Sequence, residues 1–136
     1  MCKKPKFLIC EICGNMAQLI KDAGVPMICC GSDMTELVPN TVETSVEKHL
    51  PVISSEAGTC SCGSECNCIS VQVGSTLHPM EEAHNISFIY VETECGGQLN
   101  CLEVGEEPKV AFCTNDKPVA VYAYCNLHGL WKTEVK

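Results

Sequence analysis

The second part of the chain is a series of short β-rich runs in which apolar and polar positions tend to alternate. Glycine, proline, asparagine or aspartate separates one run from the next. In the run 85–92, Ile86, Phe88 and Tyr90 share one face, and the other face is fairly apolar too. Six or seven strands in about 100 residues favour a β-sandwich of immunoglobulin-like size. The predicted strands are 49–54, 69–75, 85–92, 99–104, 109–114 and 119–125.

The first part of the chain has a different character. It contains two cysteine clusters, CEIC (10–13) and ICCG (28–31), whereas all four histidines lie after it. We find no convincing amphipathic helix, because the nearest candidate, 15–24, is short. The pattern therefore predicts a mainly β chain with a small metal-binding domain at 1–38 and a β-sandwich domain at 39–136.

Composition adds one outlying number, 13 cysteines in 136 residues, a level typical of disulfide scaffolds or metal proteins. The apolar stretch FLIC (7–10) is too short for an export signal, and no apolar run approaches the length of a membrane span. We therefore expect a cytoplasmic chain with reduced thiols, in which clustered cysteines bind metal. The net charge is −8, and the sequence contains no basic stripe. Nucleic acid is therefore not an expected partner.

The N-terminal cysteines have the spacing of a metal site. Cys10 and Cys13 form a CxxC pair before Gly14, and Cys29 and Cys30 precede Gly31. Glycine permits the positive φ that such a turn often needs. Four thiolates suit zinc or a single iron, and the spacing does not choose between them. Since adjacent side chains diverge in an extended chain, Cys29 and Cys30 can share one ion only if the backbone bends there.

The histidines are less diagnostic when each is taken alone. His49, His78 and His84 lie in EKHLP and LHPMEEAH, and the spacing of the last two does not fit a helical HExxH zinc site. Cys125 and His128, three residues apart in YCNLHG, could share a metal, form a catalytic dyad, or have no joint role.

Taken together, these motifs resemble the desulfoferrodoxin family of two-iron superoxide reductases. CxxCG and CCG, then EKHxP, HPMEExH and YCNxHGxWK occur in the family's order over nearly the whole chain. The resemblance implies a rubredoxin-like iron in a desulforedoxin-like N-terminal domain, bound by Cys10, Cys13, Cys29 and Cys30. It also implies a catalytic iron with four equatorial histidines, His49, His78, His84 and His128, and an axial thiolate from Cys125.

The same resemblance implies the activity, the partners and two further site residues. The activity is one-electron reduction of superoxide to hydrogen peroxide with an external donor, either a rubredoxin-type carrier or a reductase, and the protein is expected to be a homodimer. Lys48 would attract superoxide and assist its protonation, and Glu47 would bind the oxidised iron after peroxide leaves. Without the resemblance, the two residues would be an ordinary solvated ion pair.

The segment GTCSCGSECNC (58–68) departs from the family pattern. Alternation puts Cys60 and Cys62 on one face of a strand and Cys66 and Cys68 on one face of its return, and a turn at 63–65 would bring the pairs opposite each other. Three interpretations remain open: a third metal site, two cross-strand disulfides, or a thiol-rich tip. Of the other cysteines, Cys95, Cys101 and Cys113 could be small buried hydrophobes, and Cys2 lies near the terminus.

Two alternatives to the enzyme stay open at this point. One is an electron-transfer or metal-binding protein that does no chemistry of its own. The other is a zinc-stabilised β module for protein interaction. Metal analysis separates them, because two irons per chain support the enzyme and zinc alone supports the interaction module.

Overall fold

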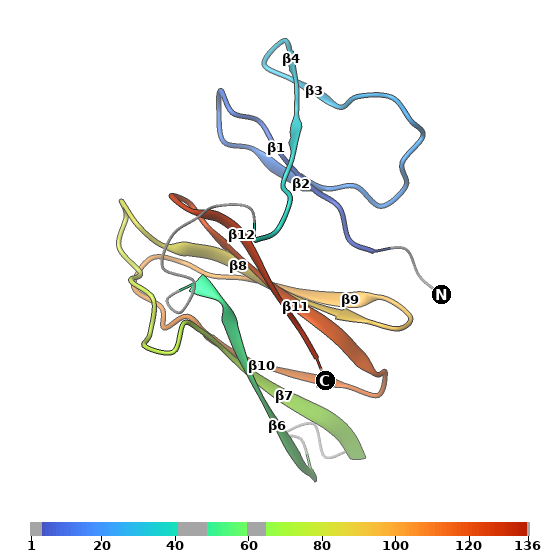
Figure 1. Cartoon of the computed structure of the whole chain (residues 1–136), viewed down its shortest axis with the longest axis vertical. Coiled ribbons are helices and arrows are strands. Elements are labelled where there is room, and N and C mark those ends of the chain that lie inside the picture. The colour runs from blue at the N-terminus through green and yellow to red at the C-terminus, as the bar shows by residue number, and fades with distance from the viewer. Residues whose placement is uncertain (1–3, 41–48, 60–64, 136) are drawn as a thin grey trace. The chain divides into compact units, whose positions relative to one another are not determined.

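The computed structural model describes residues 4–40, 49–59 and 65–135, with the side chains of 55–59 and 65–67 outside the description. The chain divides into two compact units between Val38 and Pro39 (Figure 1). We call the part before this point the small unit and the part after it the large unit. No helix in the described ranges is long and apolar enough to cross a membrane.

The small unit is built from short strands, and many of its large apolar side chains are exposed, so its core is small. Phe7, Leu8 and Cys10 are its buried apolar side chains. Met16, in the segment 15–24 that offered the nearest helix candidate, instead begins strand β2. One sheet has the order β2–β1–β5, and β3 and β4 pair as a hairpin. The bounds are β1 Phe7–Ile9, β2 Met16–Gln18, β3 Ile28–Cys29, β4 Ser32–Asp33 and β5 Thr35–Glu36.

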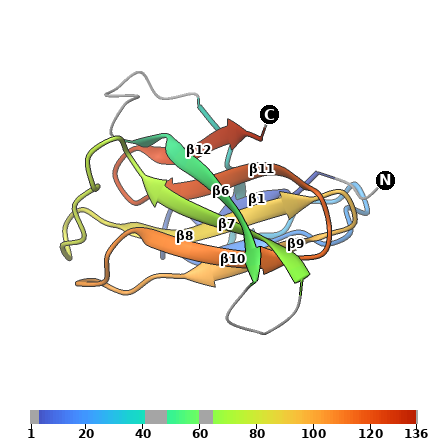
Figure 2. The ribbon, with the colours of Figure 1, turned by 90° about the horizontal axis from the view of Figure 1, so that it is seen from below.

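The large unit is an immunoglobulin-like β-sandwich, as the spacing of strand runs predicts. Its described residues form one sheet of order β10–β7–β6 and another of order β12–β11–β8–β9 (Figure 2). Every pairing within these sheets is antiparallel. The bounds are β6 Pro51–Thr59, β7 Glu65–Val73, β8 Ile86–Thr93, β9 Gly97–Cys101, β10 Lys109–Thr114, β11 Pro118–Cys125 and β12 Gly129–Glu134.

The core of the large unit follows from the alternation of side chains along the strands. On β7, Ile69, Val71 and Val73 are buried and belong to the apolar cluster between the sheets. The intervening positions, including Cys68, therefore face away from that cluster. Strands β8 and β11 contribute further members, and the last residue of β11, Cys125, is one of them. The core thus reaches the end of the sandwich where the histidines gather.

The register of β6 and β7 corrects one expectation. The ladder runs from Pro51 opposite Val73 to Thr59 opposite Glu65, so Cys66 and Cys68 pair with Gly58 and Glu56. Strands β6 and β7 form the expected antiparallel pair, but Glu65 already belongs to β7, and Cys66 and Cys68 do not lie opposite Cys60 and Cys62 as expected. The physical reason is that the backbone ladder continues through Glu65, beyond the apolar residues of the run. Cys60 and Cys62 lie outside the described residues.

Candidate metal centres

The four N-terminal cysteines converge as their spacing predicts. The sulfurs of Cys10, Cys13, Cys29 and Cys30 all lie within 4.8 Å of one another. The Sγ atoms of Cys13 and Cys29 are 3.6 Å apart. That distance is close to the edge of roughly 3.8 Å implied by a tetrahedron with metal–sulfur bonds of about 2.3 Å. The four sulfurs therefore fit a single tetrahedral metal ion.

The backbone explains how two adjacent cysteines reach the same point. Cys30 has a φ of 52°, and Gly31 after it has a φ of 73°. A left-handed conformation costs a residue with a side chain about 1 kcal/mol, so it persists only where something else requires it. Here it bends the β3–β4 hairpin so that Cys29 and Cys30 point to one site. Gly14, after the first pair, has a φ of 84°, as the CxxC turn predicts.

Hydrogen bonds shift the pKa values of the thiols in this cluster in opposite directions. The backbone amide of Cys13 lowers the pKa of Cys10 to about 6, whereas hydrogen bonding with Cys13 and the other sulfurs raises the pKa of Cys30 to about 12. Asn15 donates its backbone N–H to the Cys13 sulfur at 3.5 Å and its Nδ2 to the Cys29 sulfur at 3.7 Å. Without a cation the four thiols cannot all ionise, because each thiolate opposes the next. A bound metal removes this conflict.

The second cluster is assembled from three separate segments of the large unit. His49 precedes β6, and His78 and His84 lie in the loop between β7 and β8. Cys125 ends β11 and His128 lies in the following turn. The pairing of β11 with β8 shifts register between Tyr124 and Cys125. Such irregularities re-aim a side chain at the end of a ladder, and this one lies at the residue that carries the thiol.

The side chains of this cluster lie within metal-binding distance. The ligand atoms of His49, His84, Cys125 and His128 all lie within 4.8 Å of one another. The Cys125 Sγ and the His128 Nδ1 are 3.6 Å apart. His78 falls outside this mutual set of four, yet its ring centroid lies 5.0 Å from that of His49 and 4.5 Å from that of His84. The structure therefore brings all five sequence-selected residues together.

His78 is held in the tautomer that suits a metal ligand. Its Nδ1 lies 2.8 Å from the carbonyl oxygen of Pro79, and a carbonyl can only accept, so Nδ1 carries the proton. Burial lowers the pKa of His78 to about 4, so the ring is neutral at pH 7. The Nε2 atoms of His78 and His84 are buried and make no hydrogen bond within the described part of the chain. These lone pairs are oriented for a cation.

Cys125 supplies the negative charge of the cluster. The residue is fully buried, and burial raises the pKa of its thiol, although the backbone amides of Leu127 and His128 act in the opposite sense. A thiolate in this position therefore needs a cation beside it. Four imidazoles and one thiolate are a donor set suited to iron.

Two asparagines tie together the loops that carry the ligands. Asn126 accepts a hydrogen bond from the Asn85 backbone at 2.9 Å and donates its Nδ2 to the Ala83 carbonyl at 3.1 Å. Asn85 in turn donates its Nδ2 to the carbonyls of Glu81 and Glu82. The loop that holds His84 is thus bound to the turn that follows Cys125. The sequence analysis missed both asparagines, although each lies next to a ligand motif, HN and CN.

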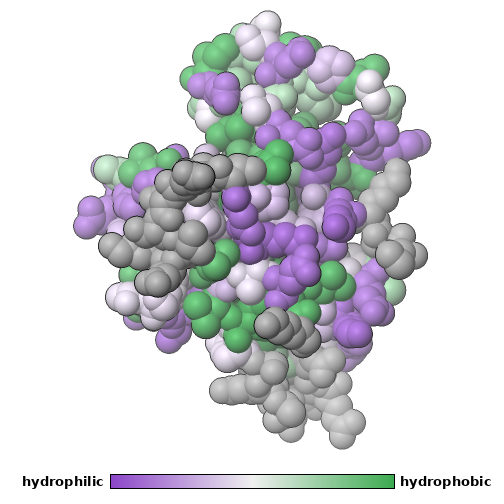
Figure 3. Space-filling model, viewed as in Figure 1, coloured by the Kyte–Doolittle hydropathy of each residue, from purple (hydrophilic) through white to green (hydrophobic). Residues whose placement is uncertain are grey.

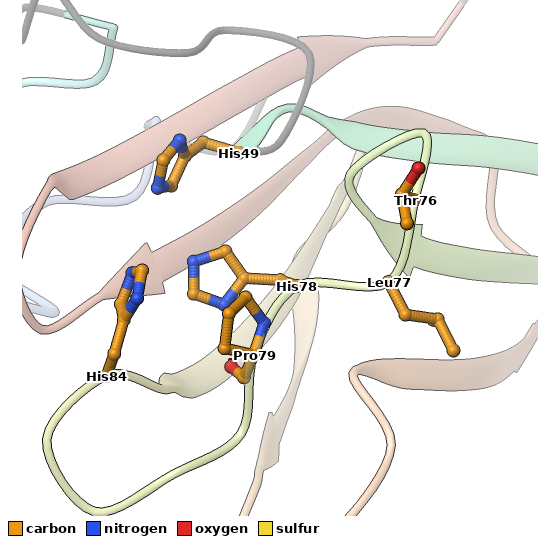
Figure 4. Close-up of a pocket in the computed structure, with 6 residues that line it drawn as sticks. All are labelled: His49, Thr76, Leu77, His78, Pro79 and His84. Carbon is orange, nitrogen blue, oxygen red and sulfur yellow. The ribbon is translucent and has the colours of Figure 1, made fainter.

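A cavity of ≈ 380 Å³ opens beside the histidines. Its described lining residues are His49, Thr76, Leu77, His78, Pro79 and His84, and the rings of His49, His78 and His84 point toward one another in Figure 4. Cys125 is not among these described lining residues. A small molecule that enters the cavity therefore meets the imidazoles on a side where the thiol is not exposed.

The remaining sequence-selected residues divide into four groups. Glu47 and Lys48 lie outside the described residues, as do Cys2, Cys60 and Cys62. Cys95 and Cys101 are exposed, so the expectation of burial is wrong for them, because each lies on or beside the edge strand β9. Cys68 takes part in a disulfide. Cys113 is a half-buried free thiol.

A four-thiolate site in a small β unit and a histidine–cysteine site at one end of an immunoglobulin-like sandwich define a two-centre iron protein. The family model described as "Desulfoferrodoxin, N-terminal domain" matches residues 5–37, and the model described as "Desulfoferrodoxin" matches residues 41–134. The chain belongs to the desulfoferrodoxin family.

Individual relatives agree with the family models. A desulfoferrodoxin of Syntrophotalea carbinolica is 37% identical over 98% of this chain and 99% of the relative. A desulfoferrodoxin of Nitratidesulfovibrio vulgaris is 36% identical, with 92% of both chains covered. Among solved structures, the superoxide reductase of Treponema pallidum superposes with a TM-score of 0.76 at 28% identity, covering 97% of this chain and 100% of that one.

Proposed function

We propose that the chain is a superoxide reductase that converts superoxide to hydrogen peroxide at the histidine–cysteine site of the large unit. The observation that carries this proposal is the convergence of four imidazoles and one buried thiol beside a cavity large enough for a diatomic anion. An electron carrier that does no chemistry would not need a cavity at its metal ligands. The chain's family and its structural likeness to a named superoxide reductase support the same activity.

In this proposal His49, His78, His84, His128 and Cys125 are the ligands of the catalytic iron. The neutral histidines hold the metal without adding charge, and the Pro79 carbonyl fixes which nitrogen of His78 faces it. Cys125 supplies the single negative charge and donates electron density. The asparagine pair holds the loop of His84 against the turn of His128, so that the ligands keep their spacing through a redox cycle.

An iron held by these residues would supply one electron to superoxide. The balance of the reaction is one superoxide, one electron and two protons to one hydrogen peroxide, so no oxygen is formed. The cavity admits the anion to the imidazoles, and the protons come from solvent or from a nearby acid. Because the electron leaves the protein in each cycle, an external reductant must return it.

Lys48 and Glu47 complete the proposal for the catalytic site. They immediately precede His49 in the sequence. Lys48 would draw superoxide toward the site against the net charge of −8 and help to protonate it. Glu47 would bind the oxidised iron after peroxide leaves.

The small unit, residues 1–38, would carry the second iron on its four cysteines, and residues 39–136 the catalytic iron. Cys13 and Cys30 are exposed, so an external donor could approach this centre closely. A rubredoxin-type carrier or a reductase is the donor class we propose.

The small unit also presents an apolar surface that supports a homodimer. Ile20 is 90% exposed, Val25 is 70% exposed and Ile12 is 65% exposed, and Figure 3 shows hydrophobic side chains on the visible face of this unit. Contiguous exposed apolar side chains are typical of an interaction surface, and we propose that these residues belong to one. Sedimentation of the intact chain tests the dimer, and Ile20→Lys is expected to weaken it. We also propose a reducing, cytoplasmic compartment, because the cysteines of both metal sites must be reduced to bind iron.

The experiment that tests the function begins with purification without oxygen. Metal quantitation is expected to give two irons per chain, with visible spectra that show a thiolate-bound iron in each unit. Zinc alone would overturn the proposal in favour of a structural module. Two irons without reaction with superoxide would favour the electron carrier.

A further inference from the structure

Two cysteines outside both iron sites lie side by side on neighbouring strands. Cys68 on β7 and Cys113 on β10 are direct partners in the antiparallel ladder. Their sulfurs are 3.2 Å apart. Since Cys68 is disulfide-bonded and Cys113 is a free thiol, a thiol is held against one sulfur of an existing disulfide.

The position of this pair makes it accessible to small reagents. On β10, Phe112 is buried in the core, so Cys113 next to it faces the opposite side of the sheet. Cys68 likewise alternates with the buried Ile69. Both cysteines are half-buried, on the outer face of the β10–β7–β6 sheet. A small thiol or disulfide can reach them without opening the sandwich.

The backbone around the pair is already in the geometry that a bond between them needs. Directly opposed residues in antiparallel strands have Cα atoms about 4.5–5.5 Å apart. Disulfides span Cα separations of about 4.4–6.8 Å. The Cys113 carbonyl also accepts a hydrogen bond from the Gln98 side chain at 2.9 Å, which fixes this point of β10 from strand β9. No strand movement is required.

We propose that Cys68 and Cys113 form a reversible cross-strand disulfide, reached by thiol–disulfide exchange within the sheet. The Cys113 thiol loses its proton to solvent and attacks the Cys68 sulfur. The Cys68–Cys113 bond forms, the present disulfide bond of Cys68 breaks, and its former partner leaves as a thiolate that takes up a proton. The step is redox-neutral and needs no external oxidant. The outer face of the sheet is thus a redox-modification site separate from both iron centres.

Mapping of disulfides in the iron-loaded chain tests this proposal. The protein is equilibrated with glutathione disulfide or with dithiothreitol, quenched in acid and alkylated. Cleavage after Lys109 and before Asp116 releases Cys113 in segment 110–115. With glutathione disulfide, we expect this segment to be linked to the segment that carries Cys68, and with dithiothreitol we expect the link to be lost.

Three variants assign the linked atoms. Cys68→Ser is expected to abolish the link, whereas Cys66→Ser and the exposed-thiol control Cys95→Ser are expected to keep it. Full alkylation of Cys113 in the wild-type chain under both conditions would overturn the proposal, as would a link that survives Cys68→Ser. If Cys68→Ser fails to fold, fragmentation of the linked peptide from the wild-type chain identifies the cysteine joined to Cys113, because segment 49–109 carries other cysteines besides Cys68. The visible spectrum of the iron centres reports folding in each sample.

Discussion

The imidazole of His49 is stacked on the indole of Trp131, with ring centroids 5.1 Å apart and an angle of 20° between the planes. Trp131 lies on β12 and is almost fully buried. His49 lies two residues before β6, and β6 and β12 belong to different sheets. The stack on Trp131 therefore fixes the plane of the His49 imidazole from the opposite sheet. The sandwich core thereby orients the metal site.

This stack predicts graded effects of substitution at Trp131. Trp131→Ala removes the surface on which His49 rests and leaves a cavity, so we expect a loss of about 3–5 kcal/mol in unfolding free energy. We also expect an altered spectrum of the catalytic iron. Trp131→Phe keeps a flat ring and serves as the matched control, with a smaller change in both measurements. An unchanged iron spectrum in a folded Trp131→Ala protein would show that the stack does not orient His49.

Cys125→Ser tests whether this cysteine is a ligand of the catalytic iron. The variant replaces the sulfur by an oxygen of similar size, so the sandwich is expected to fold, while the thiolate-to-iron charge-transfer band of the catalytic centre disappears. Cys95→Ser, at an exposed position, should leave the band unchanged. Visible absorption of the oxidised protein is the measurement. Persistence of the band in Cys125→Ser would exclude this residue as the ligand.

Lys48→Ala tests electrostatic attraction of the substrate. We expect the superoxide reaction to slow by up to about tenfold at low salt, since a single charge near a site focuses an anionic reactant. The difference should shrink toward 1 M salt, where the Debye length falls to about 3 Å. Stopped-flow or pulse-radiolysis rates at several ionic strengths measure this effect. Lys109→Ala, on β10, removes one positive charge from another position and is the control. If it slows the reaction as much as Lys48→Ala does, the effect of Lys48 comes from the net charge of the protein and not from its position.

Tyr122→Phe tests a buried polar pair in the sheet that carries Cys125. The Tyr122 hydroxyl donates to the buried Glu92 carboxylate at 2.9 Å. Burial and the carboxylate both raise the pKa of Tyr122, so the hydroxyl keeps the proton that it donates. We expect the variant to lose about 1–3 kcal/mol in unfolding free energy. Tyr124→Phe, on the same face of β11, is the control. Denaturant titrations measure the unfolding free energy of both variants, and an equal loss in the two would show that the hydrogen bond to Glu92 does not stabilise the fold.

Much of the fold could be predicted from residue pattern alone. Alternation in runs such as 85–92 is set by burial on a sheet face, which is a local property, so each of the six predicted runs overlaps a strand of the large unit. Strand β12, Gly129–Glu134, was not among the predicted runs. Strand ends were less accurate. The strand predicted to begin at Ile69 begins at Glu65 in the structure. This is because β7 is paired on both sides, and its ladder extends beyond the apolar residues.

The site could be predicted only in part. His49 and His128 are 79 positions apart in the sequence and their ring centroids are 4.5 Å apart in the structure, and no local rule places them together. The motif resemblance supplied that information. Trp131 and Asn126 were missed because their roles depend on tertiary contacts, with His49 and with Asn85, that spacing does not encode. The contact of Cys68 with Cys113 depends on strand order, which the sequence also leaves open.

The stoichiometry of the reaction tests the central claim most directly. The fully reduced, iron-loaded chain is mixed with a known amount of superoxide, and hydrogen peroxide and oxygen are both measured. A superoxide reductase yields one peroxide for each superoxide consumed and no oxygen, with oxidation of the catalytic iron. One peroxide and one oxygen for every two superoxide molecules would instead show dismutation and contradict the account.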